Sequence, residues 1–174
     1  MKNLILTSLL VLLLGCSQSV TAQASLSSPT QAADKFYRTY LKLSIRGLPN
    51  DKQMEVLSPL ITPDLKVLFE AARKTQMKFI QEHPDEKPPW VEGDLFTSLF
   101  EGAQTFRIGR PTVRGDLTEV PVQLTYREGG STTRWSDVLI LVRRGKRWLV
   151  RDIELKGDWA FKNGGSLRSI LRSD

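Results

Sequence analysis

The chain has 174 residues, of which 40% are hydrophobic and 25% are charged, and its formal net charge at pH 7 is +6. This length predicts one domain that is large enough to bury a core of its own. The single cysteine, Cys16, excludes an internal disulfide bond. The single histidine, His83, precedes a proline, so we expect neither a multi-histidine metal site nor a histidine-based catalytic triad.

The N-terminus has the pattern of an export signal. Lys2 precedes an apolar stretch over residues 4–14, which is much shorter than the roughly 20 residues needed to span a bilayer. Cys16 follows a small glycine at the end of this stretch, where a lipidating enzyme needs an unhindered thiol. Leu12-Leu13-Leu14-Gly15-Cys16 resembles the bacterial lipobox. The resemblance implies cleavage before Cys16 and attachment of acyl chains such as palmitate.

Several acyl chains on one residue anchor a protein stably, whereas a single chain is marginal. We therefore expect a bacterial envelope protein held in a membrane by Cys16. Ser17 follows the cysteine in place of an aspartate, and by the lipoprotein sorting pattern this favours the outer membrane, facing the periplasm. The alternative is an ordinary secretory signal cleaved after Ala24, which would remove Cys16.

The predicted organisation has three parts. Residues 1–15 form the signal peptide, and residues 16–29 form the lipidated cysteine with a flexible linker rich in serine, alanine, threonine and glutamine. Residues 30–174 form a single α+β domain.

The first half of this domain has helical periodicity. Apolar residues recur at helical spacing over residues 30–46, with Thr30 as the expected N-cap. A short helix is expected to begin at Asn50 or Asp51. A longer one begins at Thr62-Pro63 and ends at His83, because threonine suits the N-cap and proline suits the first helical position.

The second half has strand periodicity. A proline-rich link over residues 84–94 leads to residues 94–100, which we expect to add one helical turn. From Gln104 the hydrophobic period changes to two, and Gly129-Gly130 and Gly145-Lys146 have the composition of hairpin turns. The expected strands are near 106–108 and over 119–126, 135–142 and 147–155. Helices followed by an antiparallel meander predict an α+β layer with helices across one face of a curved sheet of about four strands.

This order of elements resembles the cone-shaped ketosteroid-isomerase/SnoaL-like superfamily. A more specific resemblance lies in the run from Trp90 to Gly102, WVEGDLFTSLFEG, together with the strand around Trp148 and the following Gly157-Asp158-Trp159. These residues resemble the YbjP-type bacterial lipoprotein family of unknown function, placed in that superfamily. The resemblance covers roughly residues 30–172 and carries over no catalytic residue.

Three carboxylates are candidates for a ligand pocket. If Gly145-Lys146 are the turn residues, Asp137 lies opposite Glu154, with Asp152 two positions along on the same partly apolar face. Like charges placed opposite each other destabilise a sheet, so this face invites a ligand with cationic or hydroxyl groups. An apolar wall could also raise the pKa of an aspartate towards use as a general base. The alternative is a structural role in salt bridges or at a bulge.

Two further residues of the family-like run are pocket candidates. Asp94 could line the pocket mouth, but it also has the N-cap position before Leu95–Phe100. Trp90 could stack on a ligand or serve as an apolar lid over the open end of the domain.

A basic cluster lies at the expected hairpin around Gly145. It could contact anionic head groups or glycans, or simply be a solvated turn whose charges protect the sheet edge. Its members are Arg143, Arg144, Lys146 and Arg147.

No nucleotide-binding, metal-binding or nucleophile motif is present in the sequence, so we expect no cofactor, no metal and no catalytic set. An exported lipoprotein also makes nucleic acid an unsuitable partner for the basic charge. The main expectation is a non-catalytic envelope module that binds a small molecule or an envelope protein. The alternatives are an isomerase- or dehydratase-type enzyme with Asp137 or Asp152 as its base, and a periplasmic inhibitor or immunity-like lipoprotein.

Overall fold

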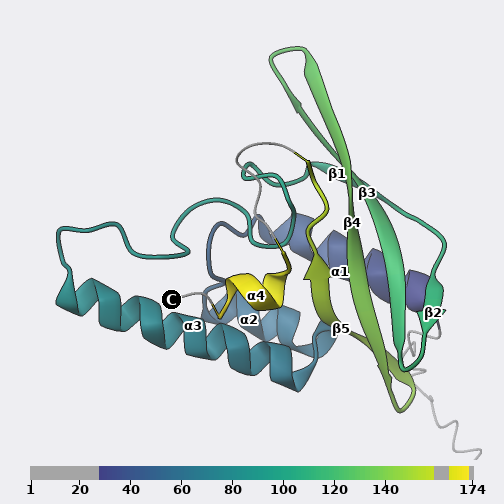
Figure 1. Ribbon diagram of the computed structural model, residues 1–174, viewed down its shortest axis with the longest axis horizontal. Helices are drawn as coiled ribbons and strands as arrows, with labels where there is room; N and C mark the ends of the chain where they lie inside the picture. Colours follow the sequence, from purple (N-terminus) through teal and green to yellow (C-terminus); the bar gives the residue numbers. More distant parts are fainter. Residues whose placement is uncertain (1–27, 159–164, 173–174) are drawn as a thin grey trace, which may run out of the picture.

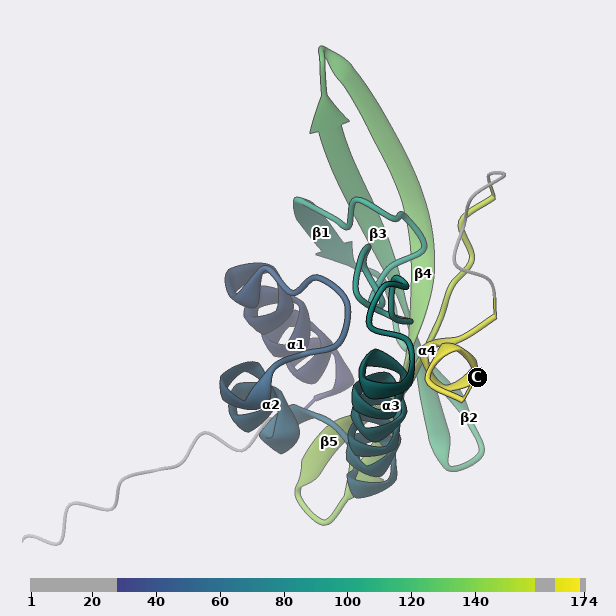
Figure 2. The same cartoon turned by 90° about the vertical axis from the view of Figure 1, so that its left-hand side faces the viewer.

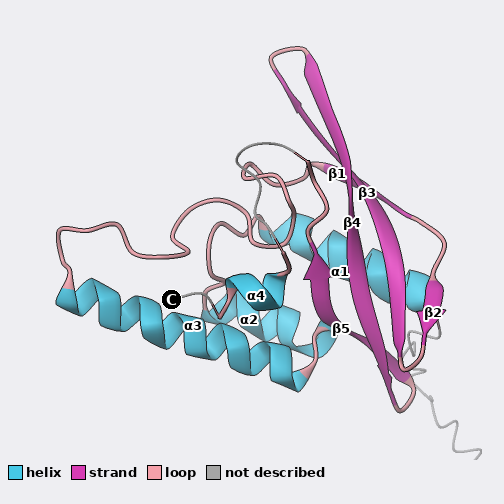
Figure 3. Cartoon of the chain, in the orientation of Figure 1, coloured by secondary structure: helices cyan, strands magenta, loops and turns pink. Residues whose placement is uncertain are grey.

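The computed structural model describes residues 28–158 and 165–172. It is an α+β protein in which helices lie on one side of an open antiparallel sheet of five strands (Figures 1 and 3). The α+β class and the helices-then-sheet order are therefore confirmed. The signal, Cys16 and the linker up to residue 27 lie outside the described residues, as do the residues from Trp159 to Gly164.

The helices begin close to the predicted positions. The first, α1 (Pro29–Leu43), is capped by Ser28, two residues before the expected Thr30, and ends at Ser44 with a left-handed backbone. Asn50 caps α2 (Asp51–Leu57) through a reciprocal capping box with Gln53. A 3₁₀ turn (Ser58–Leu60) then leads to α3 (Pro63–Glu82), which starts with proline as predicted.

The fully buried residues of α3 all lie in its first half. Its buried residues are Leu65, Phe69 and Ala72, and its C-terminal half projects away from the sheet (Figure 1). The predicted helical turn over residues 94–100 is wrong, because this segment forms bends and turns instead. The short helix α4 (Leu167–Ile170) lies against β5 (Arg147–Glu154).

Besides β5, the sheet contains β1 (Thr105–Ile108), β2 (Thr112–Arg114), β3 (Leu117–Glu128) and β4 (Ser131–Arg144). The strand order is β1–β3–β4–β5, with β2 paired to β3 beside β1. β4 lies inside the sheet between β3 and β5, and β2 was not expected. The turn end of the β3–β4 hairpin extends beyond the helices (Figure 2).

The core lies between the helices and the inner face of the sheet. Alternate residues of β3 and β4 supply its floor, among them Val122, Leu124 and Leu139, while Phe36 and Tyr37 of α1 pack from above. Phe96, from the loop before β1, stacks near Phe69 with ring centroids 5.8 Å apart. The segment that the sequence marked as family-like therefore enters the core.

Candidate functional site

Asp94 holds the loop before β1 in shape. Its side chain is only 2% exposed, and Oδ1 accepts hydrogen bonds from the backbone amides of Phe96 at 2.7 Å and Thr97 at 2.8 Å. Its own amide donates to the carbonyl of Phe100 at 2.9 Å. Asp94 thus caps a turn, the structural alternative named for it, although the turn is not helical.

The second oxygen of Asp94 ties this loop to α1. Tyr40 donates its hydroxyl hydrogen to Oδ2, and the same hydroxyl oxygen accepts from the amide of Ala103 at 3.3 Å. Burial raises the pKa of Asp94 to about 6, although the bonds from Tyr40, Phe96 and Thr97 lower it. Burial and the nearby Asp94 charge raise the pKa of Tyr40. A small hollow of about 100 Å³ borders Tyr40 and Asp94.

Asp137 is fully buried and joins the same loop to the sheet. Oδ2 accepts from the amide of Ser98 at 2.9 Å and from the indole nitrogen of Trp135 at 3.0 Å. Oδ1 accepts from the Ser98 hydroxyl and from the amide of Lys156 at 2.8 Å. The Ser98 oxygen in turn accepts from the amide of Gly157 at 2.9 Å. Asp137 is thus the centre of a buried hydrogen-bond network that connects three segments.

The predicted register between β4 and β5 is wrong beyond Leu141. Leu141 pairs with Val150, but Ile140 pairs with Asp152, because a bulge lies at this point. Glu154 consequently lies opposite Val138 and not opposite Asp137. The extra residue moves Asp152 and Glu154 to the face opposite Asp137, so the three carboxylates do not share a face.

The remaining pocket candidates also have partners within the protein. Asp152 accepts from the amides of Ile153 at 2.8 Å and Arg168 at 3.0 Å, which fixes α4 on β5. Glu154 pairs with Lys156 at 2.9 Å. The indole of Trp90, a half-buried residue, donates to the carbonyl of Ile170 at 3.1 Å.

The basic cluster occupies the exposed β4–β5 turn. Arg143, Arg144, Lys146 and Arg147 are all exposed. Arg147 also donates to the carbonyl of Pro59, so that one of the four cations helps to hold the 3₁₀ turn.

Within residues 28–158 and 165–172, acidic, histidine and cysteine side chains do not gather in groups of three that could hold a metal ion. The same part of the chain contains no helix that is long and apolar enough to cross a membrane.

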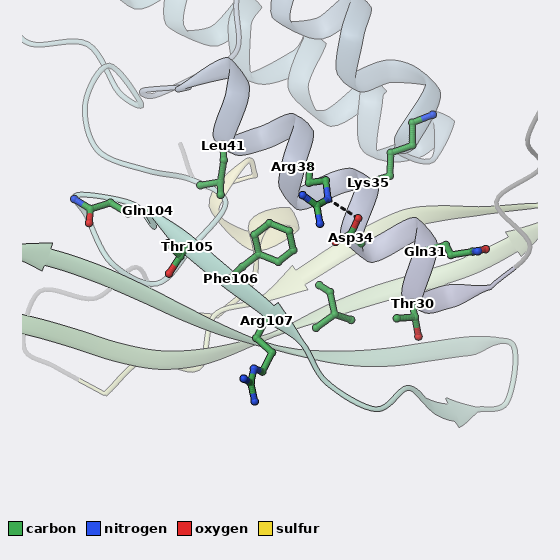
Figure 4. Close-up of a pocket in the computed structure, with 11 residues that line it drawn as sticks. Thr30, Gln31, Asp34, Lys35, Arg38, Leu41, Gln104, Thr105, Phe106 and Arg107 are labelled. Carbon is green, nitrogen blue, oxygen red and sulfur yellow. Dashed lines mark hydrogen bonds and ion pairs between the residues drawn. The ribbon is translucent and has the colours of Figure 1, made fainter.

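A groove of about 840 Å³ is lined by residues of α1 and β1 (Figure 4). Phe106, Ile108 and Leu41 supply its apolar surface, and Asp34 and Arg38 lie along α1 above Phe106. Arg38 pairs with Asp34 at 2.7 Å, and its guanidinium carbon lies 5.9 Å from the centre of the Phe106 ring.

The groove runs beside an open edge of the sheet. The amide of Gly109 donates to the carbonyl of Pro121 at 2.7 Å, and antiparallel alternation then turns the amides of Arg107 and Thr105 towards β3 as well. The backbone N–H and C=O groups of Phe106 and Ile108 therefore point away from β3. No residue that the structure describes bonds to them.

The opposite edge of the sheet is covered. The amide of Thr62 donates to the carbonyl of Val150 at 2.9 Å, and the amide of Leu155 donates to the carbonyl of Gly165 at 3.0 Å. Sequence reasoning missed the groove because hydrophobic alternation marks strands but not which strand lies at an edge. The one sequence feature that indicates an edge strand is the short length of the apolar segment around Phe106.

Comparison with known proteins gives only remote likenesses. No family model matches the sequence, and none of the curated proteins compared with it does either. One similar solved structure is a SEC-C motif containing protein from Rhodopseudomonas palustris, with 14% identity, a TM-score of 0.44, and coverage of 76% of this chain and 81% of that one.

A second similar structure is a chain of the type VI effector–immunity complex Tae3–Tai3 from Ralstonia pickettii. It has 15% identity, a TM-score of 0.46, and coverage of 77% of this chain and 99% of that one. A third, a de novo β-sheet design, has 20% identity and a TM-score of 0.34, covering 78% of this chain and 89% of that one.

Proposed function

We propose that this protein is a lipid-anchored, non-catalytic binding module of the bacterial envelope. The observation that carries the proposal is the groove between α1 and β1, which combines an apolar surface with an unpaired sheet edge. Exposed sheet edges are ready templates for pairing with another chain and are usually short, covered or charged. Here one edge is covered and the other is left beside a groove.

The lipid anchor is the second part of the proposal. It rests on the position of Cys16 after an apolar stretch and Gly15. The chain would be held in the outer membrane with its domain in the periplasm, separated from the lipid by the linker after Cys16. We also propose that the protein is a relative of the YbjP-type lipoproteins and that its domain is of the ketosteroid-isomerase type, on the basis of the resemblance described above.

The contacts of Asp137 and Asp152 favour binding over catalysis. A general base needs access to the proton that it removes. Asp137 is fully buried and accepts four hydrogen bonds from within the protein, and Asp152 fixes α4. The isomerase-type alternative depended on one of these two carboxylates.

The anchor is tested by labelling cells with radioactive palmitate. The wild type is expected to incorporate label and to fractionate with membranes, whereas Cys16→Ser takes no label and stays as the precursor. Ser19→Cys on the Cys16→Ser background restores a cysteine at the wrong position and is expected to stay unlabelled. Unlabelled wild type together with a Cys16→Ser chain cleaved after Ala24 would contradict the anchor.

The binding role is tested in the same cells with a photocrosslinking amino acid. Placed at Thr105, on β1 beside the groove, it is expected to give discrete adducts. Placed at Arg144, in the β4–β5 turn, it serves as the control. Adducts from neither position, or from both equally, would contradict a partner at the groove.

A further inference from the structure

The unpaired edge of β1 specifies a chemistry for its partner. Phe106 and Ile108 direct their backbone donors and acceptors outward, and these match the spacing of an added antiparallel or parallel strand. A peptide that pairs there would alternate its side chains between two faces of the sheet. Each face of the peptide then meets a different surface of this protein.

The inner face of such a peptide would meet apolar surface. Phe106 points towards α1 (Figure 4), and with Ile108 it lies on the face of the sheet whose neighbours on β3, Leu124 and Val122, are buried. Both side chains are half-buried, with Leu41 of α1 facing the same groove. Burying a further apolar side chain here contributes roughly 25 cal/mol per Å² of apolar area removed from water.

The outer face of the peptide would meet positive charge. Arg107 points away from α1 (Figure 4) into a hollow of about 550 Å³ on the outer face of the sheet, where Arg134 also lies. The other polar side chains that line this hollow are neutral, namely Thr105, Gln123, Thr125 and Ser136. Cross-strand neighbours of opposite charge stabilise a sheet, and like charges destabilise it.

We propose that the β1 edge binds an extended segment of a partner protein in which apolar and acidic residues alternate, apolar side chains facing α1 and acidic side chains beside Arg107 and Arg134. This inference rests on the proposed binding function and specifies its partner.

Two other occupants fit the edge less well. A second copy that used both outward amides of β1 would place Arg107 opposite the Arg107 of that copy, and like charges would repel. The segment that precedes Pro29 in this chain, residues 17–27, contains no acidic residue. The charge of the edge therefore favours an acidic partner over either of them.

The experiment uses the full chain, purified in detergent, and two short synthetic peptides. One peptide alternates valine with glutamate, and the other alternates valine with lysine. Titrations are followed by fluorescence anisotropy of the labelled peptide. The glutamate peptide is expected to bind to the wild type. Arg107→Glu is expected to lower the affinity for the glutamate peptide about tenfold, which corresponds to about 1.4 kcal/mol, and to raise the affinity for the lysine peptide. Arg144→Glu changes the net charge equally and is expected to leave both affinities unchanged.

Amide hydrogen exchange locates the bound peptide. The amides of Phe106 and Ile108 are expected to become protected on binding, whereas those of Thr105 and Arg107 are bonded to β3 already. Ile108→Pro removes one outward N–H and is expected to abolish this protection. Ile108→Ala loses the same side-chain contacts but keeps the N–H and separates the two effects.

Equal binding of the two peptides, no binding of either, or an equal loss in Arg144→Glu would overturn the acidic-strand proposal. So would self-association that Ile108→Pro abolishes, or, in a separate titration, tighter binding of a third peptide with the sequence of residues 17–27. Palmitate labelling is independent of all these measurements, so a failure of the β1 inference is distinguishable from a failure of the anchor.

Discussion

Ser98 and Asp137 are joined twice, through the backbone amide of the serine at 2.9 Å and through its hydroxyl, although 39 positions separate them in the chain. Both side chains are fully buried. These two hydrogen bonds between a loop residue and a strand residue hold the loop before β1 against the sheet. They also explain why a carboxylate occurs on the inner face of β4.

Asp137→Ala is expected to lower the free energy of unfolding by about 3–5 kcal/mol. The substitution leaves the buried donors of Ser98 and Trp135 and the partly buried amide of Lys156 without their acceptor, and each buried donor that loses its acceptor costs about 1–3 kcal/mol. Urea denaturation measures the loss. Ser136→Ala, exposed on the opposite face, is the control and is expected to stay within about 0.5 kcal/mol of wild type. Near-wild-type stability of Asp137→Ala would return this carboxylate to the list of ligand-binding candidates.

The fold was predictable from the sequence where a single local pattern determines an element. Proline at the start of α3, a capping residue before α2 and paired glycines between β3 and β4 each place a boundary. The register of β5 was not determined in this way, because a bulge shifts it by one residue. The sequence did contain a signal of this bulge. The apolar residues Val150, Ile153 and Leu155, which are buried, are spaced by three and then by two positions, and this spacing breaks the period of two.

The candidate site was less predictable than the fold. Asp94 and Asp137 were identified as unusual, but their partners Tyr40 and Ser98 lie far away in the chain, and no periodicity connects them. The groove depends on strand order, and alternation carries no information about strand order. Arg38 and Phe106 were therefore read only as parts of separate elements.

Asp94 is expected to make stability depend on pH. Its pKa rises from 3.8 to about 6 on folding, so the native state binds more protons than the unfolded state between these values, and stability falls as pH rises. The contribution is fully present below about pH 4 and is lost as pH rises through about 6. The free energy of unfolding of wild type minus that of Asp94→Asn is expected to fall by roughly 2 kcal/mol from pH 4 to pH 7. A difference that stays constant or rises would contradict this.

Tyr37 and Tyr40 offer a matched pair of hydroxyl deletions on α1. The hydroxyl of Tyr37 is buried and bonds to no residue that the structure describes, so Tyr37→Phe is expected to raise the free energy of unfolding by about 1 kcal/mol. The hydroxyl of Tyr40 donates to Asp94, so Tyr40→Phe is expected to lower it by about 1.5–3 kcal/mol. Thermal and urea unfolding of both variants check the signs. Destabilisation by Tyr37→Phe would show that its hydroxyl has a partner after all.

Gly47 is the point where the end of α1 meets the loop around Trp90. Its amide donates to the carbonyl of Gly93 at 2.8 Å, and the amide of Leu48 donates to the carbonyl of Trp90 at 3.0 Å. Gly47 has φ +63°, and a Cβ atom there would lie 2.1 Å from the Trp90 carbonyl oxygen. Any side chain must therefore separate the two segments.

Gly47→Ala is expected to lower the free energy of unfolding by about 3 kcal/mol or more, because the steric clash and the left-handed backbone act together. Gly129→Ala is the control. Gly129 has φ +54° but no atom within 4 Å of a Cβ, so it isolates the backbone cost of about 1–2 kcal/mol. Urea denaturation measures both variants. Equal losses would show that the Trp90 loop yields without cost, and that its attachment to α1 contributes little to the fold.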